Sequence, residues 1–212
     1  LLRMKDVVVG LGEIGKHIFT LISKHVNTVG YDKNTKLIPK SNQKYVKLPT
    51  RFLHICIPYN KAFNSNVKKL NVKFSPKSIV IHSTLQPKTT SNIQSKLSVP
   101  IIYSPIRGVH KRMLYDLKRY TKFFAIEKNA PRAKWACSQF SVLMRNTGVK
   151  TKHVSDPVTL ELAKIICDTS YYGWLINYAQ ISQMITSKYR VDYDEMWSFA
   201  NEIHKFLGNR PK

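Results

Sequence analysis

The first half of the chain alternates short apolar runs with longer polar stretches. Five of these runs have the length and the β-branched character of buried strands: Val7–Val9, Thr28–Tyr31, Phe52–Ile57, Ser78–His82 and Ile101–Tyr103. About ten to twenty residues separate most of them, which leaves room for a helix in each connection. The rhythm predicts a βαβα arrangement, in which helices cover both faces of a mostly parallel sheet.

The same alternation continues to about residue 154. Thr121–Ile126 predicts a further strand, and Pro131–Met144 predicts a helix with proline in its first turn and Gly148 just beyond its end. A last short strand is expected over Val149–Val154. Residues 1–154 are therefore expected to form one α/β domain with a doubly wound sheet.

A different pattern begins at Asp156, which can cap a helix whose first position is Pro157. From there a helical pattern runs to about Tyr189, and a second helix is expected over Asp192–Leu207. At about 1.5 Å per residue the first helix would be about 50 Å long, so two helices cannot bury all its faces. Residues 155–212 are expected to form a small all-helical domain whose long helix is covered by a second copy of the chain or by a further C-terminal region.

The charge of the chain is strongly positive, at +23 for 212 residues. No carboxylate lies between Asp32 and Asp116, an interval that carries sixteen lysines and arginines. Such a field attracts polyanions, which leaves three interpretations: a compositional bias, an anionic small-molecule ligand or nucleic acid. No nucleic-acid-binding motif accompanies the charge, so nucleic acid is the least favoured of the three.

The cysteine content and the hydropathy bear on the compartment. Cys56, Cys137 and Cys167 are too few and too scattered for a disulfide framework or a zinc site, so no metal is expected and each is interpreted as a small buried apolar residue. No apolar run reaches the roughly 18 residues that cross a bilayer, and no signal peptide opens the chain. We expect a cytoplasmic protein without a membrane segment.

The most specific motif is Gly10-Leu11-Gly12-Glu13-Ile14-Gly15, which directly follows the first predicted strand and opens a helix. In a dinucleotide-binding loop the first glycine permits the tight turn, the second lets the backbone approach a pyrophosphate, and the third lets the helix pack on the strand. Asp32 ends the second strand twenty residues after Gly12, where an acid holds the adenosine ribose. A strand-turn-helix junction that needs glycine for packing alone is the alternative.

Asp32 also bears on the choice of cofactor. A carboxylate at this position binds the ribose hydroxyls and repels a 2′-phosphate, so NAD is favoured over NADP. Lys33 and Lys36 follow closely and provide cations that suit the extra phosphate of NADP, which keeps that alternative open.

Four further segments resemble the NAD-dependent UDP-sugar dehydrogenases and, more loosely, the 6-phosphogluconate and β-hydroxyacid dehydrogenases. They are Cys56-Ile57-Pro58, the stretch from His82 to Thr90, Tyr103-Ser104-Pro105 and the stretch from Glu161 to Thr169. The resemblance covers nearly the whole chain. It implies a Rossmann-type NAD(P)-binding domain, a helical second domain that forms a homodimer through its long helix, and a substrate site between the two.

The resemblance also implies roles for individual residues. Ile57, Pro58, Ser83 and Thr84 would join the glycine loop, Asp32 and Lys33 in binding the cofactor, with Ser83 and Thr84 beside the nicotinamide. A cap for the following helix is the alternative role of these two hydroxyls.

Three catalytic residues are expected: Lys164, Asp168 and Thr84. Lys164 matches the family's lysine, which accepts a proton from the substrate alcohol or orients that alcohol. Asp168 stands where the family has asparagine, and a carboxylate four residues after Lys164 would keep its amine protonated. A surface ion pair between the two is the alternative.

Substrate contacts are expected from Ser104, Arg107, Gly108 and His110, together with Lys164. The family has a glutamate after the proline that follows Ser104, and this chain has Ile106 and Arg107 there. A guanidinium binds phosphate or carboxylate through two hydrogen bonds, which suits an anionic substrate; a solvated basic loop is the alternative.

These features favour an NAD-dependent dehydrogenase that oxidises an anionic alcohol such as a nucleotide sugar or a sugar acid. The family's catalytic thiol lies in a region downstream of the second domain, and this sequence stops before it, so a single hydride transfer is expected from a domain truncated relative to the family. The alternatives are a non-catalytic or truncated homologue that only binds NAD and, less favoured, a nucleic-acid-binding protein.

Overall fold

The computed structural model describes residues 3–108 and 110–207, and the chain divides into two compact units. The first runs to Ile165 and the second begins at Ile166. The expected boundary after residue 154 is therefore too early. Leu160 and Glu161 are buried within the first unit, so the turn that carries them belongs with the sheet.

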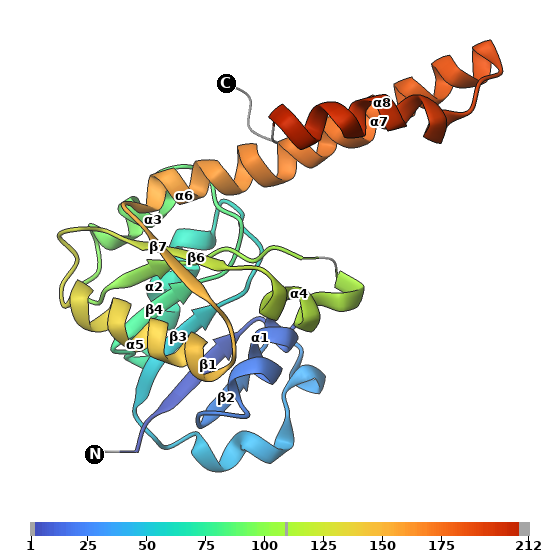
Figure 1. The fold of residues 1–212 in the computed structure, drawn as a ribbon. Coiled ribbons are helices and arrows are strands. Elements are labelled where there is room, and N and C mark those ends of the chain that lie inside the picture. The colour runs from blue at the N-terminus through green and yellow to red at the C-terminus, as the bar shows by residue number, and fades with distance from the viewer. Residues whose placement is uncertain (1–2, 109, 208–212) are drawn as a thin grey trace. The chain divides into compact units, whose positions relative to one another are not determined.

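A seven-stranded sheet forms the first unit, with the order β2-β1-β3-β4-β5-β6-β7 (Figure 1). The strands are β1 (Lys5–Val9), β2 (Thr28–Tyr31), β3 (Thr50–Ile55), β4 (Ser78–Ile81), β5 (Ile101–Tyr103), β6 (Lys122–Ile126) and β7 (Thr151–Val154). All neighbours are parallel except β5 and β6, which confirms the predicted doubly wound, mostly parallel sheet. After β5 the chain returns through a short helix to the same edge of the sheet, so β6 runs in the opposite direction.

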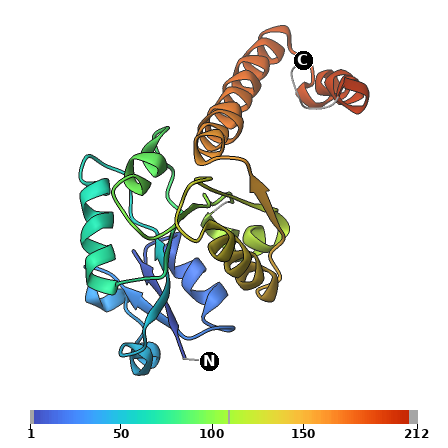
Figure 2. The same cartoon turned by 90° about the vertical axis from the view of Figure 1, so that its left-hand side faces the viewer.

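Two helical layers cover the sheet, as Figures 1 and 2 show. One contains α1 (Gly15–Ile22), α4 (Met113–Arg119) and α5 (Ala133–Asn146), and the other α2 (Phe63–Phe74), α3 (Thr89–Gln94) and α6 (Pro157–Ala163). Successive strand residues point to opposite faces, so Val8 packs in the first layer while Val7 and Val9 pack in the second. Three short 3-10 turns complete this unit: Thr35–Leu37, Lys40–Tyr45 and His110–Arg112.

The long helical segment that begins at Pro157 is confirmed, but it is not one regular α-helix. Asp156 caps α6 by accepting a hydrogen bond from the Thr159 N–H at 2.9 Å, as expected. A π-helical segment, Lys164–Ser170, then precedes α7 (Tyr171–Tyr189), and α8 (Tyr193–Leu207) follows. A run of helix-forming residues does not distinguish i→i+4 from i→i+5 hydrogen bonding, which is why the π segment was not predicted.

The second unit is built from α7 and α8, which contact each other through Tyr178 and Trp197 with their ring centroids 5.9 Å apart. Among its described residues only Ser182 and Thr186 are buried, and large apolar side chains such as Trp174 and Met184 are each 73% exposed. Within the described ranges, no helix combines the length and the apolar character that crossing a bilayer requires.

Candidate functional site

A large pocket lies where the strand order changes direction. β1 sits between β2 and β3, and the connections leaving β1 and β3 run to opposite faces, so a crevice opens at the carboxyl ends of these strands. The pocket there has a volume of about 880 Å³, within the range of ligand sites. It is lined by Val9 at the end of β1, by Gly10, and by Cys56 and Ile57 after β3.

The three glycines of the loop differ in why the structure needs a residue without a side chain. Gly10 has a φ of +85°, and a Cβ there would lie 2.9 Å from the carbonyl oxygen of Cys56. A Cβ on Gly15 would lie 1.6 Å from the carbonyl oxygen of Gly10, so no larger residue fits. A Cβ on Gly12 would meet no atom within 4 Å, although Gly12 lines the pocket. Packing alone accounts for Gly10 and Gly15, but it does not account for Gly12.

Asp32 joins the glycine loop to the end of β2. Its Oδ2 accepts the Leu11 N–H at 2.6 Å, and its Oδ1 accepts the Asn34 N–H at 2.8 Å. A carboxylate oxygen accepts more than one hydrogen bond, so both can still accept a ribose hydroxyl. The carboxylate lines the pocket beside Lys33, whereas Lys36 does not.

Two further cations line the same pocket and were missed by the sequence reasoning. Lys69 and Lys73 come from α2, and the Lys73 amine donates to the Tyr31 hydroxyl at 2.8 Å and lies 4.0 Å from the ring centroid. Both belong to a lysine-rich interval, so nothing in the sequence separates them from the other surface lysines.

The residues expected beside the nicotinamide line the pocket as well. Ile57, Pro58, Ser83 and Thr84 all contribute to its wall. The Ser83 hydroxyl donates to the carbonyl oxygen of Ile57 at 2.6 Å, which joins the ends of β3 and β4, while Thr84 is exposed. Neither hydroxyl caps the next helix, because α3 begins at Thr89 and its first amides have another partner. Most of the other residues expected to bind the cofactor also line the pocket: Gly10, Gly12, Glu13, Ile14, Asp32 and Lys33. Gly15 is the one expected cofactor residue that does not line it.

Ser104, Arg107 and Gly108, three of the residues expected to contact substrate after β5, do not line this pocket. Ser104 is buried and its hydroxyl donates to the Phe123 carbonyl oxygen at 2.8 Å. Arg107 donates to the Thr121 carbonyl oxygen at 2.9 Å, and Gly108 has a φ of +147°, where a Cβ would lie 2.8 Å from the Asp116 Cβ. His110 begins a 3-10 turn, and its side chain lies outside the described part of the structure.

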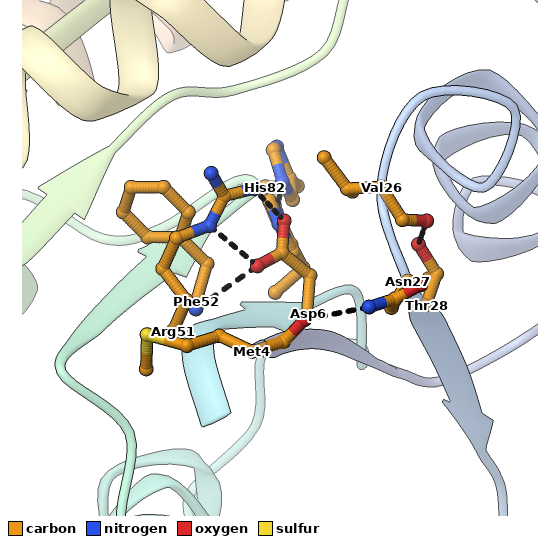
Figure 3. Close-up of polar contacts among 9 residues, drawn as sticks. Met4, Asp6, Val26, Asn27, Thr28, Arg51, Phe52 and His82 are labelled. Atoms are coloured by element: carbon orange, nitrogen blue, oxygen red, sulfur yellow. Dashed lines mark hydrogen bonds and ion pairs between the residues drawn. The ribbon is translucent and has the colours of Figure 1, made fainter. Parts of the chain in front are cut away.

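A buried row of polar side chains crosses the α1/α4/α5 face of the sheet. Asp6 accepts two hydrogen bonds from Arg51, at 2.9 and 2.7 Å, as Figure 3 shows. The His54 Nδ1 lies 3.0 Å from the His82 Nε2, and the His82 Nδ1 lies 3.0 Å from the Ser104 carbonyl oxygen. A carbonyl only accepts, so His82 Nδ1 carries the hydrogen and His54 donates to His82. Burial lowers the pKa of His82 well below its ordinary value, which keeps the ring neutral.

Lys122 ends this row at the carboxyl edge of β5. It is 5% exposed, and its amine donates to the carbonyl oxygens of Ser104 at 2.9 Å and Pro105 at 3.4 Å. Burial, followed by the charges of Arg107 and Lys164, lowers its pKa to about 7, with Cys56 acting in the opposite direction. The sequence signal for the row is one polar residue within or at the end of each otherwise apolar strand: Asp6, His54, His82 and Lys122.

Cys56 and Cys137 offer no activated thiol. Burial raises the pKa of the Cys56 thiol to about 12 and also raises that of Cys137. Cys56 and Cys137 are half-buried, but Cys167 is exposed, so the expectation that all three are buried is wrong. Cys167 lies in the helical unit, whose described side chains are mostly exposed.

Lys164 and Asp168 are half-buried, and neither lines the pocket. Lys164 follows α6 directly and begins the π-helical segment, which also contains Asp168, so a spacing argument based on an α-helix does not apply to them. One turn before Lys164, Glu161 is completely buried, and its carboxylate accepts hydrogen bonds from the loop that leads into α3. The sequence reasoning did not single out Glu161.

Solved structures of three dehydrogenases share this fold over nearly the whole chain. UDP-D-ManNAc dehydrogenase from Pyrococcus horikoshii has a TM-score of 0.74 and 16% identity, over 98% of this chain and 59% of that one. GDP-mannose dehydrogenase from Pseudomonas aeruginosa has a TM-score of 0.74 and 15% identity, over 99% and 60%. 3-Hydroxyisobutyrate dehydrogenase from Mycobacterium tuberculosis has a TM-score of 0.69 and 13% identity, over 99% and 72%.

The chain therefore has the Rossmann-type fold that the nucleotide-sugar and β-hydroxyacid dehydrogenases share, which confirms the resemblance drawn from its motifs at the level of the fold. It spans 59% and 60% of the length of the two nucleotide-sugar dehydrogenases. Comparisons with protein-family models and with curated protein sequences give no match.

Proposed function

We propose that the protein is an NAD-dependent dehydrogenase that oxidises the alcohol of an anionic substrate, such as a nucleotide sugar or a sugar acid. One observation carries the proposal: Gly12 opens toward a pocket of about 880 Å³ with no packing reason to be glycine, and Asp32 lies in the same wall. This combination suits a dinucleotide whose pyrophosphate lies on the loop.

The residues of the pocket fit such a cofactor. The loop from Gly10 to Gly15 would hold the pyrophosphate and Asp32 the adenosine ribose, while Ser83 and Thr84 would lie beside the nicotinamide. Bound NAD would supply the hydride acceptor. Asp32 favours NAD over NADP, whereas the cations of Lys33 and Lys69 in the same wall support NADP as the second candidate.

In the proposed reaction the substrate loses a hydride from its carbinol carbon and a proton from its hydroxyl. Lys164 would accept the proton, and the exposed Thr84 hydroxyl would orient the alcohol. Asp168 would pair with Lys164, which slows the wild-type enzyme. Ser104, Arg107, Gly108 and His110 are proposed to bind the anionic part of the substrate, and the high positive charge of the chain supports an anionic ligand.

We further propose that the protein is a homodimer whose interface includes α7. Trp174 and Met184 on this helix are each 73% exposed, which is unusual for side chains of their size. Sedimentation at micromolar concentration should give about twice the chain mass of 24.5 kDa, and a clean monomer would remove this part of the proposal.

Turnover is tested by mixing the protein with NAD or NADP and a panel of UDP-sugars, GDP-sugars and sugar acids, and following the formation of NADH or NADPH. Lys164→Ala should lower the rate by about 100-fold or more, the usual effect of a lost acid or base. Asp168→Asn should raise the rate at neutral pH because it removes the carboxylate proposed to pair with Lys164. If Lys164→Ala turns over like the wild type, the catalytic assignment is wrong.

Cofactor binding without turnover on any substrate would favour the non-catalytic, NAD-binding alternative. Salt-dependent retention on DNA in place of cofactor binding would favour the nucleic-acid alternative.

A further inference from the structure

Glu161 makes an unusual set of contacts for a buried acid. Its side chain is 0% exposed, and its carboxylate accepts three hydrogen bonds from one short segment. Lys88 N–H donates to Oε2 at 2.6 Å, Thr90 N–H donates to Oε1 at 2.9 Å, and the Thr90 hydroxyl donates to Oε1 at 2.6 Å. Buried glutamates are rare unless their charge is compensated, and here the three donors are uncharged amide and hydroxyl groups.

These contacts make Glu161 the cap of a helix to which it does not belong. α3 begins at Thr89, and its cap residue Lys88 makes no side-chain cap bond. The first amides of a helix have no partner within the helix, and a carboxylate placed there also interacts favourably with the helix dipole. Lys88 has a φ of +69°, a strained conformation for a residue with a side chain, and its N–H is one of the groups that Glu161 holds.

The three hydrogen bonds from Lys88 and Thr90 to the Glu161 carboxylate, called the clamp below, join two segments that carry proposed functional groups. The loop that Glu161 holds begins with Ser83 and Thr84 in the pocket wall. On the other side, Lys164 follows Glu161 by three residues, about one helical turn, and both belong to the first compact unit. Fixing Glu161 on the loop therefore fixes the turn that carries Lys164.

We infer that Glu161 is a positioning residue, which ties the turn carrying Lys164 to the loop carrying Thr84 and so sets the distance between the proposed proton acceptor and the proposed substrate-orienting hydroxyl. The roles of Lys164 and Thr84 rest on the proposed function. The clamp itself rests only on the three hydrogen bonds and the burial of the carboxylate.

Glu161→Gln tests the inference with little change of shape. The amide oxygen can keep the Thr90 contacts, but the NH₂ group then faces the Lys88 N–H, and two donors cannot bond. Asp156→Ala is the matched control. It removes the cap of α6, where Asp156 accepts the Thr159 N–H, and it leaves the Lys88 and Thr90 contacts intact.

The first measurement, amide hydrogen exchange, does not require enzymatic turnover. Amide hydrogen exchange at Lys88 and Thr90 should accelerate about tenfold or more in Glu161→Gln, since a lost hydrogen bond opens the loop. In Asp156→Ala faster exchange should be confined to α6. If Lys88 and Thr90 exchange at the wild-type rate in Glu161→Gln, the clamp does not exist and the inference is overturned.

The second measurement, of kcat and of the affinity for NAD, separates a positioning role of Glu161 from a purely structural one. Glu161→Gln should lower kcat about tenfold while the affinity for NAD stays within about twofold, because the loop of Gly10–Gly15 is untouched. Asp156→Ala should keep kcat at the wild-type value. Faster exchange with an unchanged kcat, or an equal loss of kcat in both variants, would overturn the positioning role. A wild type without turnover would overturn the proposed function instead, and the exchange measurement would still decide the clamp.

Discussion

Titration of Lys122 should strongly affect the stability of the fold. Its amine is buried on β6 and donates to the carbonyl oxygens of Ser104 and Pro105, which are uncharged acceptors and do not offset the desolvation of the charge. The pKa falls from 10.5 to about 7 for this reason, with the charges of Arg107 and Lys164 contributing in the same direction.

The magnitude follows from proton linkage. Between pH 7 and 10.5 the unfolded chain holds the Lys122 proton and the folded chain releases it, so the free energy of unfolding rises with pH in this interval. Each pH unit contributes about 1.4 kcal/mol, and the whole interval contributes about 5 kcal/mol. This stability is fully present above pH 10.5 and is lost as the pH falls to about 7.

The Lys122→Met variant isolates this contribution, because methionine fills a similar volume without an ionisable group. Urea denaturation at several values between about pH 7.5 and 9.5 should give a pH slope that is lower than the wild-type slope by about 1.4 kcal/mol per pH unit. Lys118→Met, an exposed position on α4, makes the same formal change and should keep the wild-type slope. Parallel slopes for wild type and Lys122→Met would refute the assignment of a buried, depressed lysine.

Three other predictions concern the sheet and the loop. Asp6→Asn should lower the free energy of unfolding by about 3 kcal/mol at neutral pH, because it removes the buried negative charge beside Arg51 and His54. Burial alone would raise the pKa of Asp6, but these partners lower it. The difference in stability from the wild type should therefore shrink when denaturation is repeated below pH 3.8. Gly15→Ala should lower stability by about 3 kcal/mol or more in thermal melts, since its Cβ would lie 1.6 Å from a carbonyl oxygen, whereas Gly12→Ala should melt like the wild type; equal melting of the two variants would contradict the loop geometry. Asp32→Ala should lose the preference for NAD over NADP in calorimetric titrations, and an unchanged preference would mean that Asp32 does not contact the ribose.

The strands of the first unit could be located from the sequence because a strand buried on both faces must be apolar throughout. Every predicted strand lies within a few residues of an observed one, from β1 at Lys5–Val9 to β7 at Thr151–Val154. The direction of β6 could not be predicted, since an apolar run has no polarity and the outcome depends on where the preceding helix returns the chain. The end of the first unit was also misplaced, because the burial of Glu161 depends on a loop 73 residues earlier.

The glycine loop and Asp32 could be recognised in advance because their spacing is local. The loop, its strand and its helix are consecutive, so the motif already specifies the geometry around Gly12. The sequence did not allow the same recognition of Lys69, Lys73 and the buried row that ends at Lys122, because their positions depend on the packing of segments far apart in the chain. The roles of Lys164 and Arg107 remain predictions for the same reason.

The proposed function depends most directly on cofactor binding at the loop of Gly10–Gly15. Calorimetric titration of NAD into the wild type and into Gly12→Val tests it, since a valine at this position meets no atom near its Cβ yet fills the space above the loop. The proposed function predicts a saturable binding isotherm for the wild type, and for Gly12→Val the same thermal melting but no detectable binding. Equal affinity for NAD in the two proteins, or no binding of NAD or NADP to the wild type, would contradict it.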